Sequence, residues 1–377
     1  KTAYEIGVRL VGSEMCIRDS ANTDDWDTGI VQHLLPAVNE STMLLKASFT
    51  TALNESPLLK IQTNGSQRSI QGFMNDTQCE FWQFYADELQ PDTEYELTIQ
   101  DTSGNSLCES WPLKTFPSSQ QNPERVRVLF YTCAGGPEGE YFGVGDRRGN
   151  LPISIRQRLL KRGLSFAPQA AVANGDHIYW DLHTWQGDRA GELSPAGQES
   201  DFDFSSRVMG GSNELAMKLA AGPQIAPLYG TAFRSTPVFF LQDDHDHWEN
   251  DSPLTYPVPW FQLQLARTTQ QLYYPEFLPD INRSAGLPYS TTSARGELSE
   301  SFGTLRYGQL LEVLLYDVRR TLNVGELNAV FLDSNVENWL TDRTASRDTR
   351  HLVHVPSNPP GWTAGKWGEW YLSLIHI

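Results

Sequence analysis

The sequence predicts an α/β protein that is built from an all-β part followed by a part in which strands and helices alternate. Residues 21–117 contain strand-length apolar runs separated by turn residues, whereas residues 125–371 alternate such runs with helical segments. Four apolar runs of the chain also end directly in side chains that bind metals. Such strand ends are typical of an open α/β sheet that holds a site at its carboxyl edge.

Both ends of the chain are set aside first. Residues 1–20 and 372–377 resemble translated sequencing-adapter read-through, although a genuine polar helix and apolar tail are the alternative. The first interpretation implies that the natural protein continues beyond both ends. We therefore predict a first domain at 21–117, a polar linker at 118–124 and a second domain at 125–371.

The first domain reads as strands throughout. The segments STMLLKASFT, PLLKIQT, CEFWQFYADEL and TEYELTIQD have strand length, and Tyr95, Leu97 and Ile99 alternate along the last one. The string LQPDTEYEL resembles the tyrosine corner of fibronectin III-like and immunoglobulin-like β-sandwiches. The sequence therefore predicts an immunoglobulin/fibronectin III-like β-sandwich here, with no chemistry of its own.

In the second domain, strands and helices follow each other in order. The strand RVRVLFY precedes the helix LPISIRQRLLKRG, which we expect to end at Gly163. The strand QAAVAN, the helix NELAMKLAA, the strand PVFFLQ, the helix PWFQLQLARTTQQLYY and the strand LEVLLYDVRR follow. This alternation predicts βαβ units and an α/β sheet.

Charge and composition limit the partners. The formal net charge of −17 argues against nucleic acid or an anionic membrane as a stable partner, but not against a phosphorylated substrate held by bound cations. No apolar run reaches the roughly 18 residues of a membrane span. Cys79 and Cys108 could pair in an oxidising compartment, which their spacing alone does not decide.

The segment NGDHIYWD places Asp176 at the end of a predicted strand, where Gly175 lets the backbone approach a ligand and Tyr179 offers an oxygen. Alternatively, Asp176 caps a helix and Tyr179 packs in the core. After PVFF, the segment QDDHDHWEND gathers five acids and two histidines. An ordinary solvated acidic turn is the alternative, but crowded carboxylates at a buried strand end need cations or protons, and oxygen ligands favour Ca²⁺, Mg²⁺, Mn²⁺ or Fe.

Two further positions have weaker signals. Cys133 follows a strand, where a lone cysteine is more often a small buried apolar residue than a ligand. Asp317 and Arg319 form either a structural ion pair or a phosphate-binding guanidinium beside the site. The histidines interpreted as packing or supporting residues rather than ligands are His177, His183 and His247.

Together, FYTC, ANGDHIYWD, TPVFFLQDDHDHWEND, QLYYPEFLPD and HVPSNPPGWTAGKWGEWY resemble the PhoD-type alkaline phosphatases (alkaline phosphatase D), a branch of the calcineurin-like metallophosphatases. The resemblance spans nearly all of residues 21–371 and implies an αββα metallophosphatase domain, truncated at its C-terminal side. It implies a phosphoester hydrolase with Fe³⁺ and Ca²⁺, in which a metal-bound hydroxide attacks phosphorus in line. Carried over position by position, the implied metal ligands are Cys133, Asp176, Tyr179, Asp244 and Asn250, and the implied catalytic residues are His245 and Arg319.

The same resemblance implies a secreted or periplasmic enzyme that acts on a phosphorylated small molecule or lipid. Family members have a later Gly-Asp-x-His motif that this chain lacks, which implies an impaired fragment. A phosphodiesterase or phospholipase on the same centre is an alternative function. A non-catalytic secreted binding protein, with the β-sandwich as its working part and a degenerate site, is another.

Overall fold

The computed structural model describes residues 25–358 except 64, 137–140, 144–145, 149–150, 181–201, 249–257, 285, 289–297, 323–329 and 347. For residues 141–143 and 146–148, which form the hairpin of β10 (Tyr141–Gly143) and β11 (Asp146–Arg148), only the backbone is described.

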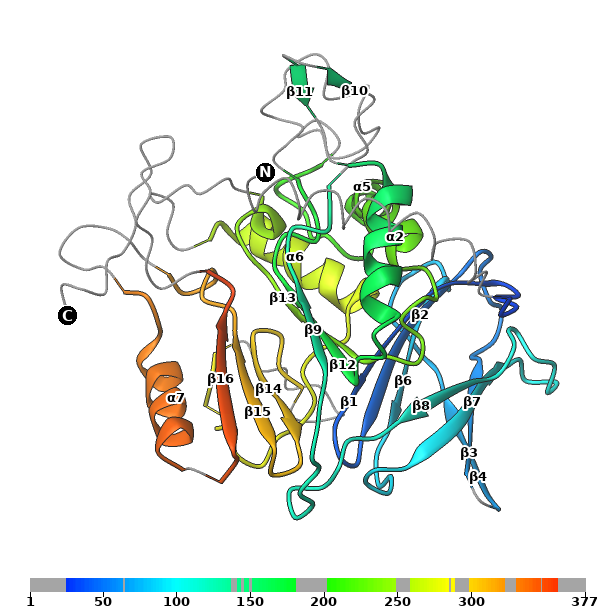
Figure 1. Cartoon of the computed structure of the whole chain (residues 1–377). Helices are drawn as coiled ribbons and strands as arrows, with labels where there is room; N and C mark the ends of the chain where they lie inside the picture. Colours follow the sequence, from blue (N-terminus) through cyan, green and yellow to red (C-terminus); the bar gives the residue numbers. More distant parts are fainter. Residues whose placement is uncertain are drawn as a thin grey trace, which may run out of the picture.

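Residues 25–116 form two four-stranded antiparallel sheets (Figure 1). The first has the order β1-β2-β6-β5, with β1 Val31–Val38, β2 Met43–Phe49, β6 Phe81–Ala86 and β5 Phe73–Met74. The second has the order β4-β3-β7-β8, with β4 Ser66–Gln71, β3 Leu58–Thr63, β7 Glu94–Gln100 and β8 Trp111–Lys114. The four strands predicted in this region are β2, β3, β6 and β7, and all four are confirmed.

Strand β7 shows why its alternating sequence predicts a half-buried strand. Tyr95, Leu97 and Ile99 are buried in the core, while the residues between them are more exposed. The hydroxyl of Tyr95 accepts a hydrogen bond of 2.7 Å from the backbone N–H of Gln90, as expected for a tyrosine corner. The assignment of this region to the immunoglobulin-like or fibronectin-like class, and the domain boundaries, stay predictions.

A parallel three-stranded sheet follows, with the order β13-β12-β9. Its elements along the chain are β9 Val128–Tyr131, α2 Ile153–Leu164, β12 Ala170–Asn174, α5 Ser212–Tyr229, β13 Val238–Leu241 and α6 Trp260–Tyr273. The central strand β12 is buried along Ala170–Ala173, as its continuous apolar sequence indicates. The predicted βαβ alternation is therefore confirmed.

One predicted helix end is confirmed to within one residue, and one is wrong. Helix α2 ends at Leu164, directly after Gly163, and a Cβ on Gly163 would lie 2.8 Å from Cδ2 of Leu129 on β9. Helix α5 was expected to stop near residue 221, but it runs on through Pro223 and Pro227 and ends before Gly230.

The last described part is a second sheet with the order β14-β15-β16, in which β15 runs antiparallel to β14 and parallel to β16. Its elements are β14 Phe302–Tyr307, β15 Leu311–Tyr316, α7 Ser334–Ser346 and β16 His351–Pro356. Strand β15 was predicted. In Figure 1 this sheet lies beside the parallel sheet, with the carboxyl ends of β9, β12, β13 and β16 all directed toward the upper side of the molecule.

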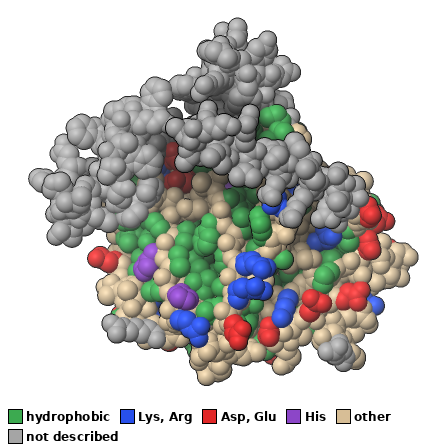
Figure 2. Space-filling view, viewed as in Figure 1, with side chains coloured by type: hydrophobic (Ala, Val, Ile, Leu, Met, Phe, Trp, Pro, Cys, Tyr) green, Lys and Arg blue, Asp and Glu red, His purple; other side chains and the backbone are tan. Residues whose placement is uncertain are grey.

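The three parts share buried contacts. One apolar cluster joins Leu45 and Leu97 of the first region to Val172 of β12 and Val313 of β15. On the face shown in Figure 2, acidic and basic side chains are interspersed, so the negative charge is not gathered into one patch there. Cys79 and Cys108 are separate thiols. None of the helices in the described residues has the length and apolar character needed to cross a membrane.

Candidate metal centre

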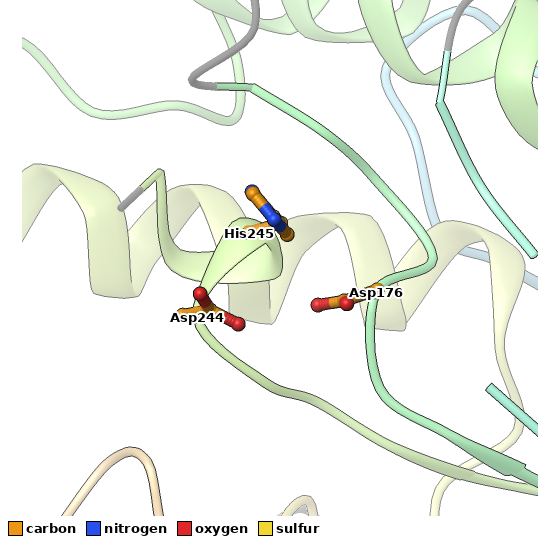
Figure 3. A group of neighbouring side chains, drawn as sticks. All are labelled: Asp176, Asp244 and His245. Carbon is orange, nitrogen blue, oxygen red and sulfur yellow. The ribbon is translucent and has the colours of Figure 1, made fainter. Parts of the chain in front are cut away.

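The candidate centre lies where the parallel sheet presents its carboxyl ends. Cys133 follows β9, Asp176 follows β12, and Asp244 and His245 follow β13. Because these strands are parallel, their three loops meet at one edge of the sheet. Figure 3 shows the carboxylate of Asp176 directed toward Asp244, with His245 above both on the short 3₁₀ helix His245–His247.

The side chains of this edge have donor atoms close enough to share an ion. One ligand atom from each of Asp176, Asp244 and His245 lies within 4.8 Å of the others. The thiol of Cys133 and the hydroxyl of Tyr179 both donate to Oδ2 of Asp176, at 3.2 and 3.3 Å. The predicted residues Cys133, Asp176, Tyr179, Asp244 and His245 are thus brought together.

The second oxygen of Asp176 is the clearest sign of an incomplete set of partners. Oδ1 of Asp176 is buried and has no hydrogen-bond partner among the described residues. A buried carboxylate oxygen without a partner is costly, and a cation at this edge would satisfy it. The carboxylates, imidazole, thiol and phenol at this edge are all side chains of types that bind metal ions.

Crowded charge raises the affinity of the site for positive ions. Burial, with the nearby negative charge of Asp244 as the next cause, raises the pKa of Asp176 to about 7. Burial and the charge of Asp244 also raise the pKa of Asp243 well above its usual value. Such groups hold a proton more readily than ordinary carboxyl groups unless a cation lies beside them.

The backbone of these loops adopts unusual conformations. Cys133, Gly175 and Asp176 have φ of +54°, +82° and +60°. A Cβ on Gly175 would lie 2.6 Å from Cβ of Asp243, so only glycine permits this approach of the two loops. Left-handed φ at residues other than glycine is costly and tends to occur at functional sites.

Two buried side chains that sequence reasoning missed support the loop after β9. Arg156 of α2 donates to the backbone carbonyls of Ala134 and Gly136, at 2.8 and 2.9 Å. Gln224 of α5 accepts from the backbone N–H groups of Gly136 and Tyr179, at 2.9 and 3.0 Å. Neither residue has a local sequence signal, because each acts on a loop far away in the chain.

The second sheet contributes from the other side. Nη2 of Arg319, after β15, lies 4.0 Å from Oδ2 of Asp244. Asp317 forms an ion pair with Arg320 at 3.0 Å, and its Oδ1 accepts the backbone N–H of Arg319 at 3.0 Å. Asn358, after β16, donates to Oδ1 of Asp243 at 3.2 Å and is a further site neighbour that the sequence did not indicate.

The remaining predicted residues separate into two groups. His177 packs in the core, with Nε2 2.6 Å from the carbonyl oxygen of Leu241 and its ring edge-on to Phe240, and His247 is also buried. Asn250 and His183 lie outside the described residues, so the role predicted for each stays a prediction.

Comparison with known proteins supports the fold. The chain is similar to a solved structure described as "Structure of PhoD", with a TM-score of 0.53 and 14% identity over 89% of this chain and 63% of that chain. A purple acid phosphatase from yellow lupin (Lupinus luteus) seeds matches with a TM-score of 0.46 and 12% identity, over 85% of this chain and 50% of that one. No protein-family model and no curated protein matches the sequence. The chain therefore has a fold similar to that of the PhoD structure and spans less than two thirds of the length of that structure.

Proposed function

We propose that this protein is a metal-dependent hydrolase of phosphoric esters. The observation that supports the proposal most directly is the convergence of Asp176, Asp244 and His245 within 4.8 Å at the carboxyl edge of a parallel sheet. The fold similarity agrees with this proposal, because the similar solved structure is that of PhoD and the sequence resembles the PhoD-type alkaline phosphatases. Two loops that follow separate strands bring crowded, partly unsatisfied carboxylates together here, and a bound cation would offset their repulsion.

In this proposal, Asp176 is the central ligand. Its Oδ1 has no hydrogen-bond partner among the described residues, and its Oδ2 accepts hydrogen bonds from the thiol of Cys133 and the hydroxyl of Tyr179. Once deprotonated, the sulfur and the phenol oxygen would themselves be metal ligands. Asp244 would complete the set from the neighbouring loop. The assignment of Fe³⁺ and Ca²⁺, the ligand role of Asn250 and the export of the protein rest on the family resemblance alone and stay predictions.

Bound cations would act as Lewis acids toward the phosphoryl group and would lower the pKa of a nucleophilic water. The protein's own residues would do the rest. Arg319 is buried, and its guanidinium faces Asp244, so it would pair with two phosphoryl oxygens and fix their orientation. The ring centroids of His245 and Tyr179 lie 4.1 Å apart, and this contact would hold the imidazole over the site, where His245 would donate a proton to the leaving oxygen instead of binding a cation.

The proposal is tested with the purified chain and two matched variants. Asp176→Asn removes the central charge of the site, whereas Asp348→Asn removes a carboxylate that pairs with Arg306 and Arg343. Asp348 precedes β16, so it belongs to the opposite end of the second sheet. Because the family resemblance implies an impaired fragment, we expect the wild type and Asp348→Asn to bind metal and to hydrolyse p-nitrophenyl phosphate or its diester slowly, and Asp176→Asn to do neither.

The two esters have the same leaving group, so their relative rates separate a phosphomonoesterase from a phosphodiesterase. Elemental analysis of the metal content measures binding without relying on turnover. A wild-type chain that binds no metal, or an Asp176→Asn variant with wild-type metal content and rate, would refute the proposal.

A further inference from the structure

Next to the candidate centre, in the short 3₁₀ helix that also contains His245, lies a carboxylate that accepts four backbone N–H groups. Asp246 is 2% exposed and belongs to the 3₁₀ helix after β13. Its Oδ1 accepts from His177 at 2.8 Å and from Ile178 at 2.9 Å. Its Oδ2 accepts from Asp176 at 2.8 Å and from Asp243 at 3.0 Å. Among the described residues no lysine, arginine or histidine forms an ion pair with it.

Three of these four donors are consecutive residues of the loop after β12. Successive N–H groups that point to one acceptor require a turn in which φ changes sign, as the +82° of Gly175 and the +60° of Asp176 provide here. The charge-assisted hydrogen bonds to the carboxylate of Asp246 stabilise this costly conformation. This backbone conformation directs the side chain of Asp176 toward Asp244 (Figure 3).

The fourth donor, the N–H of Asp243, belongs to the loop after β13. One side chain therefore connects the backbone of both loops that supply the candidate ligands. Its four acceptor positions are all occupied, since an ionised carboxylate has about four lone-pair sites. This excludes Asp246 as a further metal ligand and leaves it a role that acts through Asp176 and Asp244.

We propose that Asp246 is the positioning residue of the centre, and that its carboxylate holds the two loops in the arrangement in which Asp176 faces Asp244 and His245. The inference rests on the proposed function, because it assigns a purpose to the arrangement. An amide at this position keeps the shape but replaces an acceptor by a donor, which would face N–H groups. Supporting partners of metal ligands typically change metal affinity by about 10–100-fold when they are lost.

The test compares Asp246→Asn with Asp76→Asn in the full chain. Asp76 is a matched control, because it is also buried and accepts the backbone N–H groups of Glu80 and Phe81, at 3.2 and 3.1 Å, in the first region. Mn²⁺ is the probe, and calorimetry measures its affinity for protein whose folding has been checked by circular dichroism. Amide hydrogen exchange at residues 176–178 measures the order of the loop after β12 in the metal-free chain. The same measurement on Asp76→Asn shows how much faster exchange becomes from a general loss of stability alone.

We expect Asp246→Asn to bind Mn²⁺ about 10–100-fold more weakly and to exchange its amide hydrogens at 176–178 at least about tenfold faster, relative to the control. If Asp246→Asn does not fold, Asp246→Glu keeps the charge and is measured in the same way, with a smaller loss expected. Wild-type protection and wild-type Mn²⁺ affinity in the folded variant would overturn the inference and leave the proposed function standing. A wild-type chain that binds no Mn²⁺, Fe or Ca²⁺ would instead overturn the proposed function.

Discussion

Replacing Gly175 by alanine tests whether the candidate centre depends on the close approach of its two main loops. The Cβ of the new alanine would lie 2.6 Å from Cβ of Asp243. Two carbon atoms attract each other only at about 3.5–4.0 Å, and a Cβ atom cannot move away by side-chain rotation. The substitution must therefore push the loop with Asp244 and His245 away from Asp176.

Two costs add in this variant. Alanine in the left-handed region costs about 1–2 kcal/mol, and the overpacked contact costs typically about 1–3 kcal/mol. The free energy of unfolding of Gly175→Ala should therefore fall by about 2–5 kcal/mol. Gly104 supplies a matched control: its φ is +88°, but nothing lies within 4 Å of its Cβ position. Gly104→Ala should incur only the first cost, about 1–2 kcal/mol.

Urea-induced unfolding measures the two free energies, and Mn²⁺ calorimetry on the folded variants measures the effect on the centre. Gly175→Ala should bind Mn²⁺ more weakly than the wild type, and Gly104→Ala should bind it equally well. The reasoning is refuted if both variants lose the same stability and bind Mn²⁺ alike, because the two loops would then not meet as the structure has them.

Three further predictions concern other parts of the molecule. Burial lowers the pKa of His33 from 6.5 to about 3, so the unfolded chain takes up the proton first and the stability of the fold decreases as the pH drops from 6.5 toward 3. Between pH 7 and 4.5 the free energy of unfolding of the wild type should decrease by up to about 2–3 kcal/mol more than that of His33→Gln. The same dependence on pH in both proteins would contradict this. Lys218 of α5 forms ion pairs with Asp76 and Glu214 at 2.6 and 3.1 Å. Lys218→Met should therefore lower the free energy of unfolding, measured in urea, by about 3–5 kcal/mol, and the double variant with Asp76→Asn should recover part of this loss. An unchanged free energy of unfolding in Lys218→Met would disprove the role of these ion pairs. After removal of metal with a chelator, adding Mn²⁺ at about 100 times its dissociation constant should stabilise the wild type by about 2.7 kcal/mol in thermal unfolding, and Asp244→Asn should show no such gain.

The sequence predicts several buried strands because burial on both faces leaves a continuous apolar run, although the buried strand β1 is not among the predicted ones. Strands β12, β13 and β15 are examples, with buried residues along nearly their whole length. The strand β4, SQRSIQ, and the strand β16, HLVHVP, are largely exposed and carry no such pattern, so neither was predicted. Their place is fixed by pairing with β3 and β15, which a local reading of the sequence does not contain.

Helix α5 was predicted too short for a similar reason. Pro223 and Pro227 are normally signals of a helix end, because proline removes an N–H and disturbs the preceding turn. Here Met217, Ala221 and Ile225 are buried in the apolar cluster on the parallel sheet. Packing thus outweighs the local preference, which only tertiary structure reveals.

For the candidate centre, the sequence supplied the residue types and the strand ends. Parallel pairing then brings Cys133, Asp176 and Asp244 to one edge without further information. The sequence could not tell that Asp246 faces inward while its neighbour Asp244 faces the site, because both belong to the same acidic run. Nor could it choose which of two adjacent arginines pairs with Asp317.

The charges of the centre also indicate an order of binding. Asp176, Asp243 and Asp244 crowd one edge, and the described groups that face them from the second sheet are Arg319 and the neutral amide of Asn358. A phosphoric ester is itself an anion, so it would meet net repulsion at this edge in the absence of cations. Cations would reverse the sign of the local field and make Arg319 an additional rather than a lone positive contact. On this reasoning the acidic run, by binding cations, is the condition for binding the proposed phosphoric ester, and metal binding comes before substrate binding.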